Sequence, residues 1–188
     1  MTTDPYDVHP PALGAIVEAE RGSLPFALIH GEGLVACAAW ALGDAGITPV
    51  DHGVSWADLV ESGDTFVLHD ALCPMTPASF LADCVRTSEE RSAVVVAVRP
   101  VTDTVKQVED GYVGATIDRD ALVVVTSPIV LPAEVVASLD GLPTHDFAEL
   151  AGLLAARFPV VTVEAPPEGR RVASLDDVRL LEALTLPR

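Results

Sequence analysis

Short apolar runs alternate with amphipathic segments along this chain. The apolar runs have the length and composition of buried strands and cover residues 13–17, 65–68, 93–98, 122–125 and 160–164. Helical patterns occupy residues 34–42, a short segment from 56, 77–86, a segment from 132, 145–157 and 174–184. The run AVVVAV at 93–98 does not alternate, which is typical of a central parallel strand buried on both faces. The order of strands and helices predicts one three-layer α/β domain with a mostly parallel sheet.

Local signals mark where several helices begin and end. Gly43 follows an Ala-rich helical run and is expected to help stop it. Ser55 is the expected cap of the short helix that follows it. Thr76 followed by Pro77 reads as an N-cap with proline at the first helical position. Ser174 opens a sequence resembling a capping box, so the last helix is expected to begin there.

One polar insertion interrupts the alternation. Residues 104–118 read as a hairpin, with Asp110 and Gly111 at its turn. The string TDTVK just before and within it holds Lys106, the only lysine of the chain. The hairpin is too polar to be core on both faces, so it is predicted to be an arm that packs on something else.

The ends of the strands are where a ligand site is expected. In open α/β sheets, ligands lie beyond the carboxyl ends of the strands. That rule points to the segments after Val17, at 69–70, after Val98 and at 126–127. Asp70 directly follows a buried strand, where a carboxylate can hold Mg²⁺ beside a phosphate. It can equally order the loop or cap a helix, and the spacing alone leaves both roles open.

The charge of the chain limits its partners. With 28 acidic and 11 basic residues, the net charge is −17. Such a surface repels phosphate backbones, so neither nucleic acid nor an anionic membrane is an expected partner. A site for a small anionic ligand must therefore be locally positive against the field of the whole protein.

Length and composition indicate one folded domain. Apolar residues make up 49% of the 188, which argues against disorder. Residues 1–12 read as a flexible, Pro-rich leader and 13–188 as the domain. The leader has no pattern of a secretory signal and no apolar run is long enough to span a bilayer, so the cytoplasm is the expected location. Cys37, Cys73 and Cys84 are expected to be reduced thiols, with Cys37 and Cys84 in the core, and the scattered histidines make a zinc site unlikely.

Four segments resemble, in order, motifs of the 2-C-methyl-D-erythritol 4-phosphate cytidylyltransferase family. VLHDALCP at 67–74 resembles the family's V-H-D-A-A-R-P, and PVTDTVK at 100–106 resembles P-V-x-D-T-I-K. DR at 118–119, followed by TSP at 126–128, resembles D-R…Q-T-P-Q. GRRVASLDD at 169–177 resembles N-I-K-I-T-x-P-E-D-L. The resemblance extends from about residue 13 to about residue 184.

The resemblance implies a fold, a reaction and an assembly. The fold is a Rossmann-like nucleotidyltransferase domain whose protruding β-hairpin arm, about 102–120 here, hooks a second subunit of a homodimer. The reaction joins CTP to methylerythritol phosphate by in-line attack on the α-phosphate, with release of pyrophosphate, and uses Mg²⁺. Positioning and charge neutralisation supply most of the catalysis of such a transfer.

The resemblance also implies roles for particular residues. Asp70 stands where the family holds Mg²⁺, and Arg171 stands for a lysine that helps activate the attacking phosphate, which keeps the charge but changes its geometry. The positions that correspond to the family's substrate-facing half are Thr104 and Arg119 from the partner's arm, Ser127 in place of a threonine, and the retained arm residues Asp103 and Lys106. The arm is also compatible with a role in dimerisation alone.

The nucleotide loop departs from the family pattern. The family has a glycine-rich, basic loop here, whereas residues 17–26 are shorter and hold one glycine, two glutamates and one arginine. Arg21, Gly22 and Ser23 are the residues left to contact a nucleotide, and Arg21 can also be a solvated loop residue. Phe26, Cys73 and Ile129 replace the family's lysine, arginine and glutamine.

These replacements predict weak binding of a triphosphate. Losing two cations and gaining two acids costs roughly 4–6 kcal/mol, a factor of about 10³ or more in affinity. The leading hypothesis is therefore a catalytically weakened or inactive relative, a pseudoenzyme with a regulatory or scaffolding role. The alternative is an active nucleotidyltransferase with a rebuilt loop and an altered nucleotide or acceptor. An unrelated binding function of the α/β domain also stays open.

Overall fold

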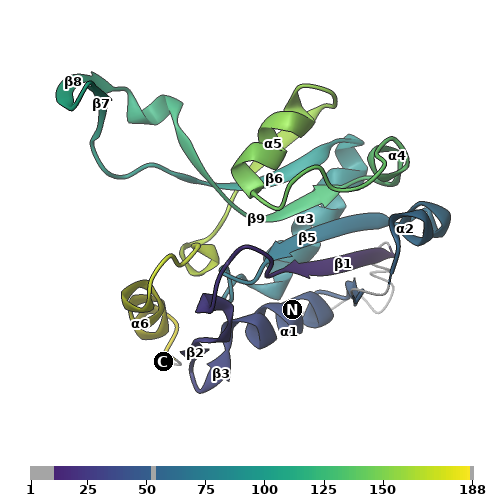
Figure 1. Cartoon of the computed structure of the whole chain (residues 1–188). Coiled ribbons are helices and arrows are strands. Elements are labelled where there is room, and N and C mark those ends of the chain that lie inside the picture. The colour runs from purple at the N-terminus through teal and green to yellow at the C-terminus, as the bar shows by residue number, and fades with distance from the viewer. Residues whose placement is uncertain (1–10, 52–53, 187–188) are drawn as a thin grey trace, which may run out of the picture.

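A six-stranded sheet forms the centre of the computed structural model, which describes residues 11–51 and 54–186 (Figure 1). The strand order is β10-β6-β9-β5-β1-β4. The strands are β1 (Ala12–Val17), β4 (Thr48–Pro49), β5 (Thr65–Asp70), β6 (Val94–Pro100), β9 (Val123–Leu131) and β10 (Val160–Glu164). β9 runs antiparallel to β5 and β6, and the other pairs are parallel. The predicted α/β class and mostly parallel sheet are confirmed.

Helices cover both faces of this sheet (Figure 1). α2 (Trp56–Ser62), α4 (Ala133–Ala137) and α5 (Phe147–Ala155) lie on one face. α1 (Leu34–Asp44) and α3 (Ala78–Arg91) lie on the other. Side chains alternate along β6, because Val94 and Val96 pack into the first layer and Val95 into the second. This two-sided burial explains why the run at 93–98 is apolar at every position, as expected.

A smaller unit packs at the end of the sheet that carries the carboxyl ends of β1 and β5. It consists of β2 (Leu28–Ile29), β3 (Glu32–Gly33) and α6 (Leu175–Leu184). His30 ties it together, because its backbone N–H donates to Glu182 at 2.7 Å and its ring nitrogen lies 2.7 Å from the Thr185 hydroxyl. Its core is Ile29, Leu34, Leu72, Val172, Val178 and Leu181. Within the described residues, no helix is both long and apolar enough to cross a membrane.

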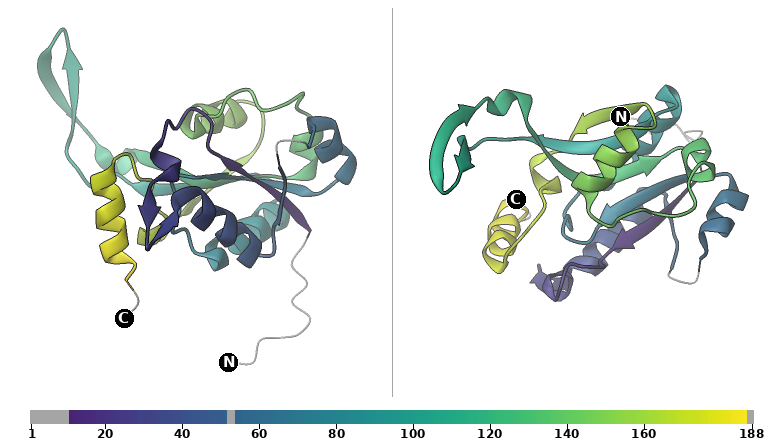
Figure 2. Two further views of the ribbon diagram at one scale, coloured as in Figure 1. Left: turned by 60° about the horizontal axis from the view of Figure 1, so that its bottom comes forward. Right: turned by 45° about the horizontal axis from the view of Figure 1, so that its top comes forward.

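The predicted hairpin is confirmed as an arm that extends away from the domain (Figure 2). β7 (Val105–Glu109) pairs antiparallel with β8 (Tyr112–Ile117). Asp110 and Gly111 have φ of 49° and 83° at the turn, the left-handed conformation that this hairpin requires. Val108, Tyr112 and Val113 are 64%, 80% and 72% exposed. The arm therefore presents apolar side chains that no other part of the described structure covers.

The expected ends of α1 and α3 were partly wrong. α1 continues through Gly43, and the chain turns only at Gly46, whose φ of 77° takes the left-handed conformation. The N-cap of α3 is Pro77 rather than Thr76, because the Thr76 hydroxyl donates to Cys73 instead of capping the helix. α3 also runs to its last residue at 91, beyond the expected end near 86. The caps expected at Ser55 and Ser174 are confirmed, since both side chains accept a backbone N–H three residues on.

The last correction concerns β9 and the leader. Residues 122–125 were expected to be buried, but they lead out to the arm and are exposed or half-buried. The buried part of β9 is 126–131, which includes a cis Ser127–Pro128 bond. Residues 1–10 of the expected leader lie outside the described part of the chain. Ala12 is the first residue of β1.

Candidate functional site

Asp70 forms the centre of the candidate site, at the carboxyl end of β5. It is 1% exposed, and both of its carboxylate oxygens are occupied. Oδ1 accepts the backbone N–H of Leu72 at 2.9 Å and lies 3.2 Å from Nε of Arg21. Oδ2 lies 3.0 Å from Nε of Arg171. Two guanidinium groups from distant parts of the chain therefore hold one buried carboxylate, and such charge-assisted bonds are the stronger kind.

A tight turn after β1 places Arg21 over this carboxylate. The backbone N–H of Arg21 donates to the carbonyl of Glu18 at 3.3 Å, and the neighbours Glu20 and Gly22 have φ of 63° and 61°. Its Nη2 also donates to the carbonyl of His145 at 2.8 Å. The Arg21 side chain is only 7% exposed, so the reading of Arg21 as a solvated loop residue is wrong. Gly22 and Ser23, the other residues predicted to contact a nucleotide, lie exposed in the same turn.

The position of Arg171 follows from the residue after it. Val172 is fully buried, and its N–H donates to the carbonyl of Leu72 at 2.8 Å. That bond fixes residues 169–173 against the loop after β5, so Arg171 faces Asp70. Its side chain is 36% exposed and stays accessible from solvent. Arg171 therefore reaches the Asp70 carboxylate.

A buried polar pair, His69 and Ser127, lies next to Asp70. The Ser127 hydroxyl accepts the N–H of Asp70 at 2.9 Å and lies 2.5 Å from Nδ1 of His69. His69 is fully buried, and burial lowers its pKa to about 4, so the imidazole is neutral at pH 7. Ser127 is also fully buried, so its hydroxyl orders the end of β5 from within the core. Its predicted contact with substrate stays a prediction.

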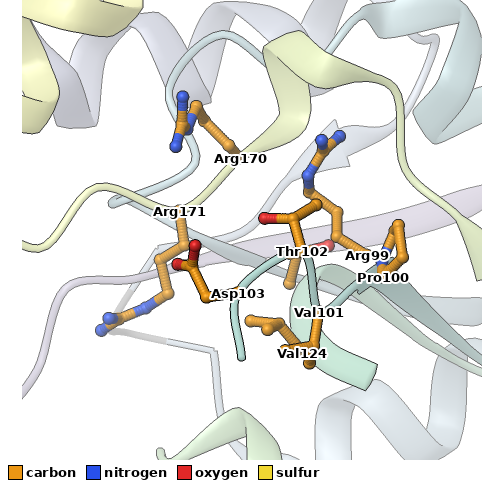
Figure 3. Close-up of a pocket in the computed structure, with 9 residues that line it drawn as sticks. Arg99, Pro100, Val101, Thr102, Asp103, Val124, Arg170 and Arg171 are labelled. Atoms are coloured by element: carbon orange, nitrogen blue, oxygen red, sulfur yellow. The ribbon is translucent and has the colours of Figure 1, made fainter. Parts of the chain in front are cut away.

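Two adjacent pockets open beside the clamped carboxylate, and Arg171 and Val124 line both. One, of about 340 Å³, is lined by two arginines and two aspartates, Arg21, Arg171, Asp70 and Asp146, and by apolar residues of β9 and α5. The other, of about 230 Å³, lies at the end of β6 and is shown in Figure 3. Arg170 and Arg171 line it from one segment, Arg99 lines it from the end of β6, and Thr102 and Asp103 line it from the segment that follows β6.

The residues predicted on the arm lie apart from Asp70 within their own chain. Lys106 donates to the Thr116 hydroxyl across the hairpin at 2.5 Å, and Arg119 donates to the carbonyl of Thr102 at 2.6 Å. Thr104 is exposed, as are these two cations. Asp103 alone among the arm predictions lines a pocket that includes Arg171. Contacts of the other arm residues with substrate stay predictions that require a second subunit.

The expected magnesium ligand does not fit a metal as the side chains are arranged. Both oxygens of Asp70 already face arginine nitrogens, whose positive charge repels a cation. Across residues 11–51 and 54–186, no group of three or more His, Cys, Asp and Glu side chains lies close enough to hold a metal ion.

Sequence reasoning missed two basic residues of the smaller pocket, Arg99 and Arg170, whereas Thr126 lies at one of the strand ends where a ligand was expected. A signal for Arg99 existed, because it directly follows Val98, one of the strand ends at which a ligand was expected. Arg170 adjoins the predicted Arg171. Nothing in the sequence indicated that the Thr126 hydroxyl is buried without a hydrogen-bond partner, which the described structure shows.

Comparisons with known proteins agree with this fold. The family model of 2-C-methyl-D-erythritol 4-phosphate cytidylyltransferase matches residues 43–153, more than half of the chain. The enzyme of that name from Saccharopolyspora erythraea is 33% identical over 131 residues, which cover 67% of this chain and 57% of the relative. That from Symbiobacterium thermophilum is 36% identical over 124 residues, covering 62% and 51%. The crystal structure of the Thermus thermophilus enzyme superimposes with a TM-score of 0.70 at 24% identity and covers 91% of this chain and 96% of that one.

The fold and the matches define an α/β nucleotidyltransferase domain. Within that class, the chain belongs to the 2-C-methyl-D-erythritol 4-phosphate cytidylyltransferase family. The resemblance in the sequence motifs is thereby confirmed. The chain spans about half of the length of the curated relatives, and the matched range 43–153 leaves out both the loop around Arg21 and the segment around Arg171. The range matched by the family model does include Asp70 and the arm.

Proposed function

We propose that this protein is a cytidylyltransferase-family member in which transfer from CTP is weak or absent. The observation that supports this proposal is the pairing of both Asp70 oxygens with Arg21 and Arg171. A carboxylate held in this way is not free to bind Mg²⁺. Its negative charge also offsets part of the positive charge of the two arginines. The cytoplasm stays the expected location.

The charge around Asp70 argues in the same direction. The pocket beside it contains two arginines and two aspartates, so its side chains carry no net positive charge. A triphosphate needs several cations or backbone N–H groups to offset its own charge. The loop after β1 does not supply them, because Arg21 turns inward and the flanking residues are Glu18 and Glu20. The net charge of −17 adds a further repulsion.

Titration calorimetry with CTP in the presence of Mg²⁺ tests the proposal. We expect a dissociation constant in the millimolar range or weaker, and no detectable release of pyrophosphate when methylerythritol phosphate is added. A micromolar dissociation constant would overturn the proposal. A CTP-binding family enzyme serves as the positive control for the ligand and buffer.

The alternative is an active nucleotidyltransferase with a rebuilt loop. The burial of Arg21 beside Asp70 favours it, because the loop after β1 keeps one cation at the carboxyl end of β5. On this hypothesis Arg21 and Arg171 would bind phosphate and Asp70 would hold Mg²⁺. Pyrophosphate release should then be measurable and should vanish in Asp70→Ala, whereas Asp176→Ala, which removes a carboxylate on the surface of α6, should leave it unchanged.

We also propose that the chain forms a homodimer through its arm. The exposed apolar side chains on β7 and β8 support this, because patches of this kind mark interaction sites. Light scattering at micromolar concentration should give twice the mass of the chain. Val113→Asp on the arm should produce a monomer, whereas Val60→Asp, an exposed valine on α2, should not. A parent protein that is monomeric at this concentration contradicts the proposal.

A further inference from the structure

A separate, mostly apolar pocket lies between α1, the β2–β3 hairpin and the segment that leads from β5 into α3. Its volume is about 350 Å³, and apolar side chains from all three parts line it, among them Ile29, Trp40, Met75 and Pro77. Among the described residues, it shares none with the two pockets beside Asp70. It is therefore a second concave site, apart from the one that the family resemblance concerns.

The helix α1 presents an outer face that is not typical of a solvated helix. Its sequence, LVACAAWALGD, has no charged residue before Asp44 at its last position. A helix on the surface of a globular domain normally carries charged and polar residues on the face turned to water. Trp40 instead is 55% exposed where it lines the pocket. An exposed indole in this position can cover the apolar body of a ligand and attract a cation to its face.

The charge of this pocket is negative. Glu32 and Asp44 line it, whereas no lysine or arginine does among the described residues. Both residues are exposed, and neither carboxylate takes part in a hydrogen bond or ion pair that the described structure shows. Burial raises the pKa of the Cys37 thiol in the same pocket, and the charge of Glu32 raises it further, so this charge acts inside the pocket. A cation is therefore favoured there over an anion.

We propose that this pocket binds a small organic cation, an apolar body that carries one ammonium group. The apolar body would pack against Trp40 and Met75, and the ammonium group would lie near Glu32 and Asp44. The volume falls within the range of small-molecule sites, about 300–1,000 Å³. A stable protein partner would have to bury about 1,000 Å² or more, whereas the apolar side chains here surround one concave pocket. The proposal does not depend on cytidylyl transfer, because neither Asp70 nor its arginines line this pocket.

Titration of the full chain with phenethylammonium chloride at low salt, followed by ¹H–¹⁵N NMR, tests this site. We expect saturable shifts of the Trp40 indole signal and of the backbone signals around 37–44 and 74–78, with a dissociation constant of about a millimolar. The indole of Trp56 lies in α2 on the opposite face of the sheet and should not shift. Phenethyl alcohol has the same apolar body without the charge and should bind about three- to tenfold more weakly. The anion 3-phenylpropionate should show no saturable binding.

Matched variants separate this site from attraction by the overall charge. Glu32→Gln combined with Asp44→Asn should weaken binding of phenethylammonium about three- to tenfold, and Trp40→Leu about two- to fivefold. Glu134→Gln combined with Asp176→Asn removes two carboxylates from α4 and α6 and should change it less than about twofold. All four acids are exposed, so both double variants should fold like the parent. Three results would overturn the proposal: no saturable shift at tens of millimolar ligand, equal binding of the alcohol, or an equal loss in the control pair.

Discussion

Nε of Arg171 lies 3.0 Å from Oδ2 of Asp70, although the two residues are 101 positions apart in the chain. Arg21, which precedes Asp70 by 49 positions in the chain, pairs with the other oxygen of the same carboxylate. Three segments of the chain thus meet at one buried carboxylate. A buried ion pair is a weak source of net stability, but breaking one is expensive because it leaves an unpaired charge. We call this arrangement of Arg21 and Arg171 around Asp70 the clamp. Within it, the charges of the site are paired with one another.

Removing one arginine of the clamp should destabilise the fold. Arg21→Met leaves Oδ1 of the buried Asp70 with only the N–H of Leu72, so we expect a loss of about 2–4 kcal/mol in the free energy of unfolding. Urea denaturation measures it. Arg179→Met removes an arginine from an exposed pair with Asp176 and should cost less than about 1 kcal/mol. Equal losses in the two variants would contradict a clamp at Asp70.

His69 should make stability fall in mild acid. Its pKa in the folded protein is about 4, against 6.5 for an unperturbed histidine. Between these values the unfolded chain binds a proton that the folded chain does not, so stability is full above about pH 6.5 and declines as the pH falls towards 4. The loss reaches about 3 kcal/mol at most. Urea denaturation from pH 7 to pH 4 measures this decline.

A matched pair of substitutions assigns that decline to one histidine. His69→Asn removes the titration and offers the Ser127 hydroxyl a carbonyl acceptor instead, so its stability should vary less over this range. His145 has an exposed side chain and bonds to Arg21 only through its backbone carbonyl. His145→Asn should therefore behave like the parent. An unchanged slope in His69→Asn would show that other groups cause the decline.

Gly14 in β1 has no room for a side chain. A Cβ there would lie 2.7 Å from Cγ2 of Ile47 and 3.2 Å from Cδ1 of Leu42, both buried. Gly14→Ala should therefore cost about 1–3 kcal/mol through overpacking, measured as a lower midpoint of thermal or urea unfolding. Gly33→Ala is the control, since a Cβ at Gly33 meets nothing within 4 Å and its φ of −64° suits alanine. A larger loss in Gly33→Ala than in Gly14→Ala would refute the packing argument.

The three free cysteines should react at different rates. Cys73 and Cys84 are fully buried, and burial raises the pKa of Cys73 and raises that of Cys84 to about 12. Cys37 is half-buried and packs against the core of the smaller unit, so its predicted place in the core is confirmed only in part, whereas that of Cys84 is confirmed. In native protein at pH 8, a disulfide reagent should modify one thiol quickly and two slowly. Cys37→Ser should remove the fast phase, and a fast phase that persists would place an accessible thiol elsewhere.

Most of the fold was accessible from the sequence because its signals are local. The apolar run at 93–98, the turn at Asp110 and Gly111 and the caps at Ser55 and Ser174 each depend on neighbouring residues. The errors arise where a local signal is ambiguous. Gly43 can stop a helix or lie within it, and only the packing of the following residues against β1 and β4 chooses.

The candidate site was accessible only in part. Asp70 was found because it follows a buried strand, and Arg171 because it lies in a recognisable segment. The burial of Arg21 was not found, since its position depends on a turn with two left-handed residues and on a carbonyl 124 positions away. Arg99 was missed for the same reason, because the pocket that it lines is formed by three separate segments of the chain.

The sequence by itself determined the α/β class, the family, the polar arm and the loss of the basic nucleotide loop, because each follows from residue types in consecutive order. The tertiary structure decided where the remaining cations go. Arg21 and Arg171 pair with Asp70, while Arg99 and Arg170 line an adjoining pocket whose side chains carry a net positive charge. Electrostatic energy depends on the distance between charges and on their burial, and neither quantity is set by separation along the chain.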